Sequence, residues 1–251
     1  MDRLIKNEFF KLKRERFVLF LALLSFLPVL TGGAGAFFNG GAQNIHDLFF
    51  FMNNQYAMFF PMVIFILVGS LFYQEYKNKT YLIWITYGHP KSKLFFSKIA
   101  VALLVGLALA ALLFLFFGVV LVVLQAANKV EGALDTYAPL ALGFFFETLI
   151  VVPVTACLGA ILINLSRNII VTSVVGVIYG FISCFFIGAE GGYLVPGGFA
   201  YRVGMFFSDP ATYYDFPRRA TIGGCASAII VFLALLLAGL RIFTHRREIE
   251  N

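Results

Sequence analysis

The stretch that decides the organisation of this chain is 75-EYKNKTYLIWITYGHPKSKLFFSK-98, a polar interlude between two long apolar segments. Within it, the run Thr80–Tyr87 is mostly apolar and contains the single tryptophan of the chain. Crossing a bilayer takes about 20 residues at a rise of about 1.5 Å each, so this run is too short to span. A short helix that is apolar on all sides is buried on more than one side. The run therefore predicts a helix packed between the membrane surface and a second protein.

The residues after this run are typical of one helix ending and another beginning. Gly88 stands where a left-handed C-terminal cap is favoured, and Pro90 follows where a proline no longer interrupts a helix. Ser92 is the predicted N-cap of the next helix, which continues through Lys98 into the membrane.

Composition places the chain in a membrane. Its 251 residues are 61% hydrophobic and 13% charged, whereas soluble domains average about 45–50% apolar and about 25% charged residues. The three cysteines, Cys157, Cys184 and Cys225, fall in apolar segments without metal-ligand spacing, which indicates packing rather than metal or disulfide chemistry. The net charge of +6 would suggest nucleic acid in a soluble protein, but here the basic residues follow a membrane topology, so no nucleic-acid partner is expected.

The fold class predicted is an all-α polytopic membrane protein, a single transmembrane domain over residues 1–251. An interfacial helix is expected at residues 1–16, a cytoplasmic region containing a short helix at 75–98 and an outer re-entrant or interfacial region at 188–219. Six transmembrane helices are expected, at about residues 17–38, 56–73, 99–124, 139–163, 169–187 and 220–240.

The positive-inside rule sets the orientation of these six helices. With this topology, fifteen of the nineteen Lys and Arg residues lie on one side of the membrane. Cytoplasmic loops carry the excess of basic residues, so both termini are predicted to be cytoplasmic. The fifteen residues are Arg3, Lys6, Lys11, Lys13, Arg14, Arg16, Lys77, Lys79, Lys91, Lys93, Lys98, Arg167, Arg241, Arg246 and Arg247.

The N-terminal segment has alternative interpretations. Residues 1–16 interleave apolar and basic side chains, which predicts an amphipathic helix in the headgroup plane, although basic flanks alone would also orient the first span. A basic start, an apolar run and Ala34–Ala36 also resemble a secretory signal. The apolar run continues past the usual signal length, which favours a retained first span.

Two further features carry polar or aromatic groups at membrane depth. Glu147 is the only acid well inside a predicted span, so it is either a polar contact in the translocation path or subunit seam, or a carboxyl hydrogen-bonded near the outer surface. Residues 188–219 are rich in aromatics and glycines, which predicts short helices forming an outer lid, with an aromatic loop on lipid as the alternative.

Glu75, the Lys79–Thr80 pair, the run Pro90–Lys93 and Lys98 together resemble the pattern of ABC-2 type transporter permeases. In that family, the loop between spans two and three forms a coupling helix that docks into an ATPase subunit. One departure is Lys79, where such permeases often have glycine. The resemblance implies an ATPase-coupling role for Glu75, Thr80, Leu82, Ile83, Trp84, Pro90, Ser92 and Lys98.

The resemblance also implies the partners. We expect an ATP-binding ABC subunit, a second copy of this permease or a similar one, and the lipid of a bacterial cell membrane. The chain has no Gly-Lys pair and therefore no P-loop, so ATP and Mg would be bound by the partner and this chain is not expected to be an enzyme. Compact permeases of this kind resemble lantibiotic-immunity and peptide-toxin exporters, which implies an amphipathic or antimicrobial peptide, or a similar hydrophobic compound, as cargo.

Other classes of protein fit less well. A secondary transporter or a non-transporting membrane scaffold is the alternative, but the chain shows no internal repeat and few charges inside its spans. An intramembrane enzyme using Glu147 would need a second polar catalytic group at similar depth, and the predicted spans supply no His, Asp, Lys or Arg.

Overall fold

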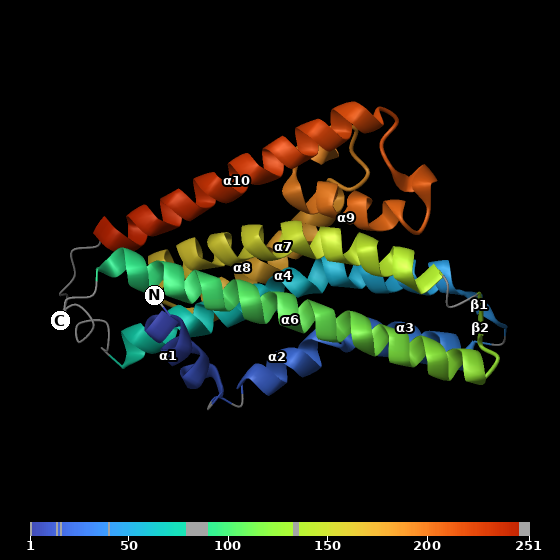
Figure 1. Cartoon of the computed structure of the whole chain (residues 1–251), viewed down its shortest axis with the longest axis horizontal. Helices are drawn as coiled ribbons and strands as arrows, with labels where there is room; N and C mark the ends of the chain where they lie inside the picture. Colours follow the sequence, from blue (N-terminus) through green and yellow to red (C-terminus); the bar gives the residue numbers. More distant parts are fainter. Residues whose placement is uncertain are drawn as a thin grey trace.

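The computed structural model describes residues 2–13, 15, 17–39, 41–78, 90–132 and 136–245, and its long elements are all helices (Figure 1). Two very short strands, β1 (Gln43–Asn44) and β2 (Val130–Glu131), pair in parallel at one end. The α-helices are α1 (Asp2–Lys13), α2 (Phe17–Ser25), α3 (Leu27–Phe38), α4 (Ile45–Lys77), α6 (Lys91–Ala126), α7 (Tyr137–Ser166), α8 (Ile169–Phe185), α9 (Pro196–Phe206) and α10 (Pro217–His245).

Four of these helices, α4, α6, α7 and α10, are long and apolar enough to cross a membrane. Helices α2 and α3 pass the same test together but are bent by 40° at Phe26, so the pair counts as a fifth span if it is continuous. The bend precedes Pro28, which has no N–H to continue the hydrogen-bond ladder. Helix α8 is apolar but has only 17 residues. The all-α class is therefore confirmed, while the count of six spans stays a prediction.

Helix α4 lies at the centre of the bundle. Two thirds of its most apolar part is buried inside the chain, compared with 17% for α10, which lies at the periphery (Figure 1). Helix α8 packs closely on α4 because Gly180 has no side chain: a Cβ there would lie 2.0 Å from the Met58 carbonyl oxygen. The outward faces of α8 and α10 carry exposed Ile170, Ile178, Phe181, Ile229, Ile230 and Leu237, as expected for surfaces in contact with lipid.

The helix boundaries correct two expectations. Helix α4 begins at Ile45, well before the predicted start at Tyr56, because Asn44 caps it by accepting from the His46 N–H. Helix α6 begins at Lys91 with Pro90 as the N-cap residue, so the prediction that Ser92 caps this helix is wrong. The proline holds φ near −65° with an extended ψ of 139°, and the chain enters the helix at the next residue, which leaves Ser92 inside the first turn.

A helix is present where the interfacial helix is predicted, namely α1, which lies at the same end of the bundle as the last turn of α10 (Figure 1). Its interfacial position stays a prediction. Its buried stripe consists of Leu4, Glu8 and Leu12, one residue per turn, while Phe10 is exposed on another face. An acidic side chain in the middle of a buried stripe requires a partner, and this partner lies at the inner ends of α4 and α6.

The segment between α8 and α10 forms short helices, as predicted. It contains the 3₁₀ turns η2 (Gly192–Leu194) and η3 (Pro210–Thr212) and the helix α9. Helix α9 packs against α7 and begins with Pro196, which suits a first helical turn. Its re-entry into the membrane stays a prediction.

Candidate functional site

Four charged side chains from three helices meet at the end of the bundle that holds α1. The Lys98 ammonium on α6 lies 2.8 Å from Oε2 of Glu8 on α1 and 3.1 Å from Oε1 of Glu75 on α4. The Lys11 ammonium lies 2.7 Å from Oε1 of Glu8 and 2.5 Å from Oε1 of Glu75. We call Glu8, Lys11, Glu75 and Lys98 the inner ion cluster.

The inner ion cluster is enclosed and electrically balanced. The Lys98 side chain is fully buried, and those of Glu8 and Glu75 are only 2% and 5% exposed. Lys98 also donates to the Leu71 carbonyl at 2.8 Å, so its ammonium is saturated by three acceptors. Two carboxylates and two ammonium groups sum to no net charge, which is the arrangement that a buried ionic group requires.

Lys11 closes the cluster on its solvent side. Partial burial lowers the pKa of its ammonium, but the charge of Glu8 and the hydrogen bonds to Glu75 and Glu8 outweigh this, and the pKa of Lys11 is raised above its ordinary value of 10.5. Lys11 therefore stays charged throughout the physiological range, and α1 stays tied to α4.

The cluster flanks the predicted coupling run. Glu75 lies in the last turn of α4, and Lys98 lies two turns into α6, so the cluster joins the two helices on either side of residues 79–89. A third contact lies at this end, where the Lys91 ammonium donates to the Thr244 carbonyl of α10 at 3.4 Å. This contact joins the start of α6 to the last turn of α10.

The predicted coupling residues divide into three groups. Glu75 and Lys98 are brought together in the inner ion cluster. Pro90 is exposed and Ser92 is half-buried at the start of α6, away from that cluster. Thr80, Leu82, Ile83 and Trp84 lie outside the described residues, so their coupling role stays a prediction.

Sequence reasoning missed Glu8 and Lys11. A signal was available, because an acid and a base three residues apart share one face of a helix, and here that face is otherwise apolar. What no local pattern could show is which charges on other helices this face meets.

Glu147 is fully buried on α7, among α4 and α9. A Cβ added at Gly204 of α9 would lie 2.1 Å from its carboxyl Oε2, so the absence of a side chain there makes room for the carboxyl. On α4 its neighbour is the carboxamide of Asn53, which is also fully buried. Within the described part of the chain, neither side chain has a partner in good hydrogen-bond geometry. The assignment of Glu147 to a translocation path stays a prediction.

Two side-chain hydrogen bonds surround this carboxyl. The Tyr56 hydroxyl on α4 pairs with Thr148 Oγ1 on α7 at 3.0 Å. The Tyr201 hydroxyl on α9 donates to Asn54 Oδ1 on α4 at 2.8 Å. These contacts join α4, α7 and α9 through polar groups as well as through apolar packing. Among the residues that the structure describes, no three His, Cys, Asp or Glu side chains gather as a metal site.

The long apolar helices and the ion cluster at one end of the bundle define a multi-pass membrane protein. A family model described as ABC-2 family transporter protein matches residues 4–183. The chain therefore belongs to the ABC-2 transporter family, a family of membrane transporter subunits, and this membership implies an ATP-binding subunit as partner. The matched residues include the whole inner ion cluster and Glu147 and end within α8. No curated protein and no solved structure matches the chain.

Proposed function

We propose that this chain is the permease subunit of an ATP-driven exporter, with ATP and Mg bound by a separate ATPase subunit. The observation that carries the proposal is the family match over residues 4–183. The inner ion cluster supports it, because it joins the two helices that bracket residues 79–89 to α1.

In this proposal the run Thr80–Tyr87 is the coupling helix and docks into the ATPase. Closure of the ATPase on ATP would push on this run, and the push would reach the inner ends of α4 and α6. Because Lys98 joins Glu75 of α4 to Glu8 of α1, these three helices would move as one body. Rigid-body motion of packed helices is a common way in which a local push becomes a large displacement.

The proposed assembly contains two permease chains and two ATPases. An ATPase dimer offers two equivalent clefts, and one coupling helix per permease then requires a second copy of this chain or a similar chain. In this assembly both termini would lie in the cytoplasm, as the excess of basic residues on one side of the predicted spans favours. The proposed cargo is an amphipathic or antimicrobial peptide, or a similar hydrophobic compound, moved out of a bacterial cell.

Co-purification tests this proposal. The chain carrying an affinity tag should retain an ATPase with a phosphate loop, and Ile83→Asp or Trp84→Asp should lose it, because a buried carboxylate disrupts an apolar contact. The matched control is Asn78→Asp, which adds the same charge at an exposed position on the edge of the segment. Retention of a fully coupled ATPase by the Trp84 variant would contradict the docking role.

A further inference from the structure

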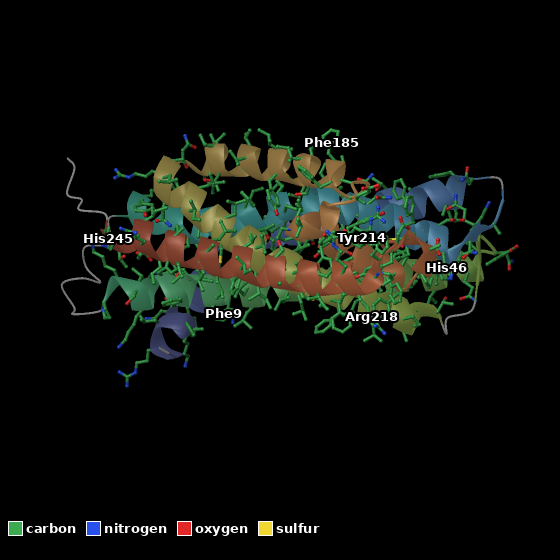
Figure 2. The ribbon with its side chains drawn as sticks, turned by 90° about the horizontal axis from the view of Figure 1, so that it is seen from above. Phe9, His46, Phe185, Tyr214, Arg218 and His245 are labelled. Atoms are coloured by element: carbon green, nitrogen blue, oxygen red, sulfur yellow. The ribbon has the colours of Figure 1, made fainter. Side chains whose placement is uncertain are left out.

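A cavity of about 370 Å³ with several charged lining residues lies in the half of the molecule away from His245 (Figure 2). It lies between the segment that follows α8, the connection before α10 and the first turn of α10. Four charged side chains and two tyrosines line it, namely Glu190, Arg202, Asp215, Arg219, Tyr193 and Tyr214.

Arg202 forms a rigid wall of this cavity. Its Nε donates to the Ile187 carbonyl at 2.7 Å, and its Nη1 donates to the Thr212 carbonyl at 2.9 Å. The guanidinium also lies 4.6 Å from the ring centroid of Tyr214, within the range of a cation–π contact. Arg202 therefore fixes the two connections and the tyrosine in place.

Tyr214 provides a donor that nothing described in the chain uses. The residue is 8% exposed, and among the described residues its hydroxyl has no hydrogen-bond partner. A buried hydroxyl without a partner costs free energy, which favours an acceptor bound nearby. Because the hydroxyl oxygen is enclosed, the Tyr214 side chain has to turn toward the cavity to donate to such an acceptor. Burial raises the pKa of Tyr214 to about 12 although the charge of Arg202 opposes the shift, so the hydroxyl keeps its proton at neutral pH.

The remaining charged groups are available to a ligand. Arg219, Glu190 and Asp215 are exposed, and none of them makes an ion pair with another described residue. The cavity thus presents a cation and a hydroxyl for an anionic group, and two carboxylates for a cationic group. The cavity is lined by four charged side chains when Arg202 is included, and their charges sum to zero. This balance matches a ligand that carries one group of each sign.

The surroundings of the cavity are apolar and face outward. Phe185, at the end of α8, is 82% exposed, and Phe216, just before α10, is 72% exposed. Ile222 in the first turns of α10 is also 72% exposed. Figure 2 shows Phe185, Tyr214 and Arg218 in the half of the molecule away from His245. Large exposed apolar side chains beside a polar cavity are typical of the boundary between acyl chains and headgroups.

We propose that this cavity binds the headgroup of a zwitterionic phospholipid of the phosphatidylethanolamine class. The phosphate accepts from Arg219 and from the Tyr214 hydroxyl, the ammonium pairs with Asp215 and Glu190, and the acyl chains lie against Phe185 and Phe216. A cavity of this volume is the size of a small-molecule site and is too small for a folded peptide. The inference concerns lipid binding alone and does not depend on the proposed export function.

Lipid retention tests this site directly. The purified full chain is incubated with phosphatidylethanolamine, and bound lipid is counted by native mass spectrometry. Arg219→Ala should weaken retention about tenfold, the effect of losing a charged hydrogen bond. Arg218→Ala is the matched control, because Arg218 is the adjacent exposed arginine and does not line the cavity. Equal retention by these two variants would overturn the proposal.

A second pair of variants removes one hydroxyl each. Tyr214→Phe should weaken lipid retention, whereas Tyr213→Phe should not, because the Tyr213 hydroxyl pairs with Thr221 at 2.8 Å outside the cavity. Both changes keep the aromatic ring, so the fold is preserved and melting temperatures should agree. Equal loss in both variants, or no loss in either, would count against a phosphate beside Tyr214.

Competing ligands identify the two charged groups. Phosphatidylglycerol has the phosphate without the ammonium, so it should bind the wild type more weakly than phosphatidylethanolamine does. The double variant Glu190→Gln, Asp215→Asn lacks both carboxylates, so it should bind the two lipids equally well. Inorganic phosphate at millimolar concentration should not displace the lipid. If phosphatidylglycerol binds as well as phosphatidylethanolamine, or if free phosphate or a cationic amphipathic peptide displaces the lipid, the site is not the one proposed.

Discussion

The Lys98 ammonium lies 2.8 Å from the Glu8 carboxylate although 90 residues separate them in the chain. Both side chains are buried, at 0% and 2% exposure, and Glu75 is the shared partner on a third helix. This contact holds α1, a helix whose exposed positions include both basic and aromatic side chains, against the two helices that lead to and from residues 79–89. The position of α1 is therefore set by ionic contacts as well as by its apolar stripe.

Replacing Lys98 by Met should destabilise the protein strongly. The change keeps side-chain length but leaves Glu8 and Glu75 with Lys11 as their remaining ammonium partner in the cluster. Removing one partner of a buried pair costs about 3–5 kcal/mol. Thermal unfolding in detergent, followed by size-exclusion chromatography, measures the loss. The control is Lys93→Met, an exposed lysine on the same helix, which should melt close to the wild type.

The same cluster predicts a rescue. Combining Lys98→Met with Glu8→Gln removes one charge of each sign and leaves the Lys11–Glu75 pair balanced. The double variant should be more stable than Lys98→Met alone, with an interaction free energy of about 0.5–3 kcal/mol between the two sites. If the stability lost by the double variant equals the sum of the losses in Lys98→Met and in Glu8→Gln, then Glu8 and Lys98 do not stabilise each other.

The contribution of Lys11 should persist to high pH. Its pKa is raised in the folded protein, so the stability that it adds is fully present below its ordinary value of 10.5 and is lost as pH rises through the higher folded value. The difference in melting temperature between wild type and Lys11→Met should be constant from pH 7 to about pH 10 and shrink above it. Lys13→Met, an exposed lysine on the same helix, is the control. A difference that disappears below pH 9 would contradict the pairing.

Close packing of α8 on α4 should make Gly180 intolerant of a side chain. A Cβ at Gly180 would lie 2.0 Å from the Met58 carbonyl oxygen and 3.0 Å from the carbonyl carbon, so backbone rather than a flexible side chain would have to move. Overpacking of this kind costs about 1–3 kcal/mol, and Gly180→Ala should lower the melting temperature. Gly35→Ala in α3, where a Cβ meets nothing within 4 Å, should be neutral or stabilising. Equal behaviour of the two variants would show that α8 can shift freely.

The enclosed carboxyl of Glu147 should tolerate replacement by an amide. Glu147→Gln preserves the shape of the side chain beside Asn53. We expect unchanged assembly and melting temperature, and unchanged transport in vesicles, because the side chain is covered by α7, α4 and α9. Glu131→Gln, at an exposed acid in β2, is the control. Altered transport in Glu147→Gln alone would place this carboxyl in the translocation path instead.

Several properties of this protein follow from the order of its residues alone. Long apolar runs must form helices in a membrane because their backbone groups have no other partners, so the all-α class needs no tertiary information. The amphipathic pattern of residues 1–16 likewise predicts α1, and the motif around residues 75–98 led to the family that the comparison confirmed. The start of α6 was misplaced because Pro90 and Ser92 lie close together in the sequence and both suit the start of a helix. The distance between them is within the one or two residues by which helix ends vary.

The tertiary structure alone decided which charges meet. Glu75 and Lys98 each fit the end of a membrane segment, and nothing in their neighbourhoods shows that they pair with each other, that Lys98 also pairs with Glu8 or that Lys11 completes the set. Pairing across three helices depends on how their faces rotate and cross, and packing of the whole bundle sets these angles. For the same reason Tyr214 and Arg219 line one cavity only because the first turn of α10 lies beside the segment after α8. The local sequence pattern determines where helices form. The contacts between distant helices depend on how the whole chain packs.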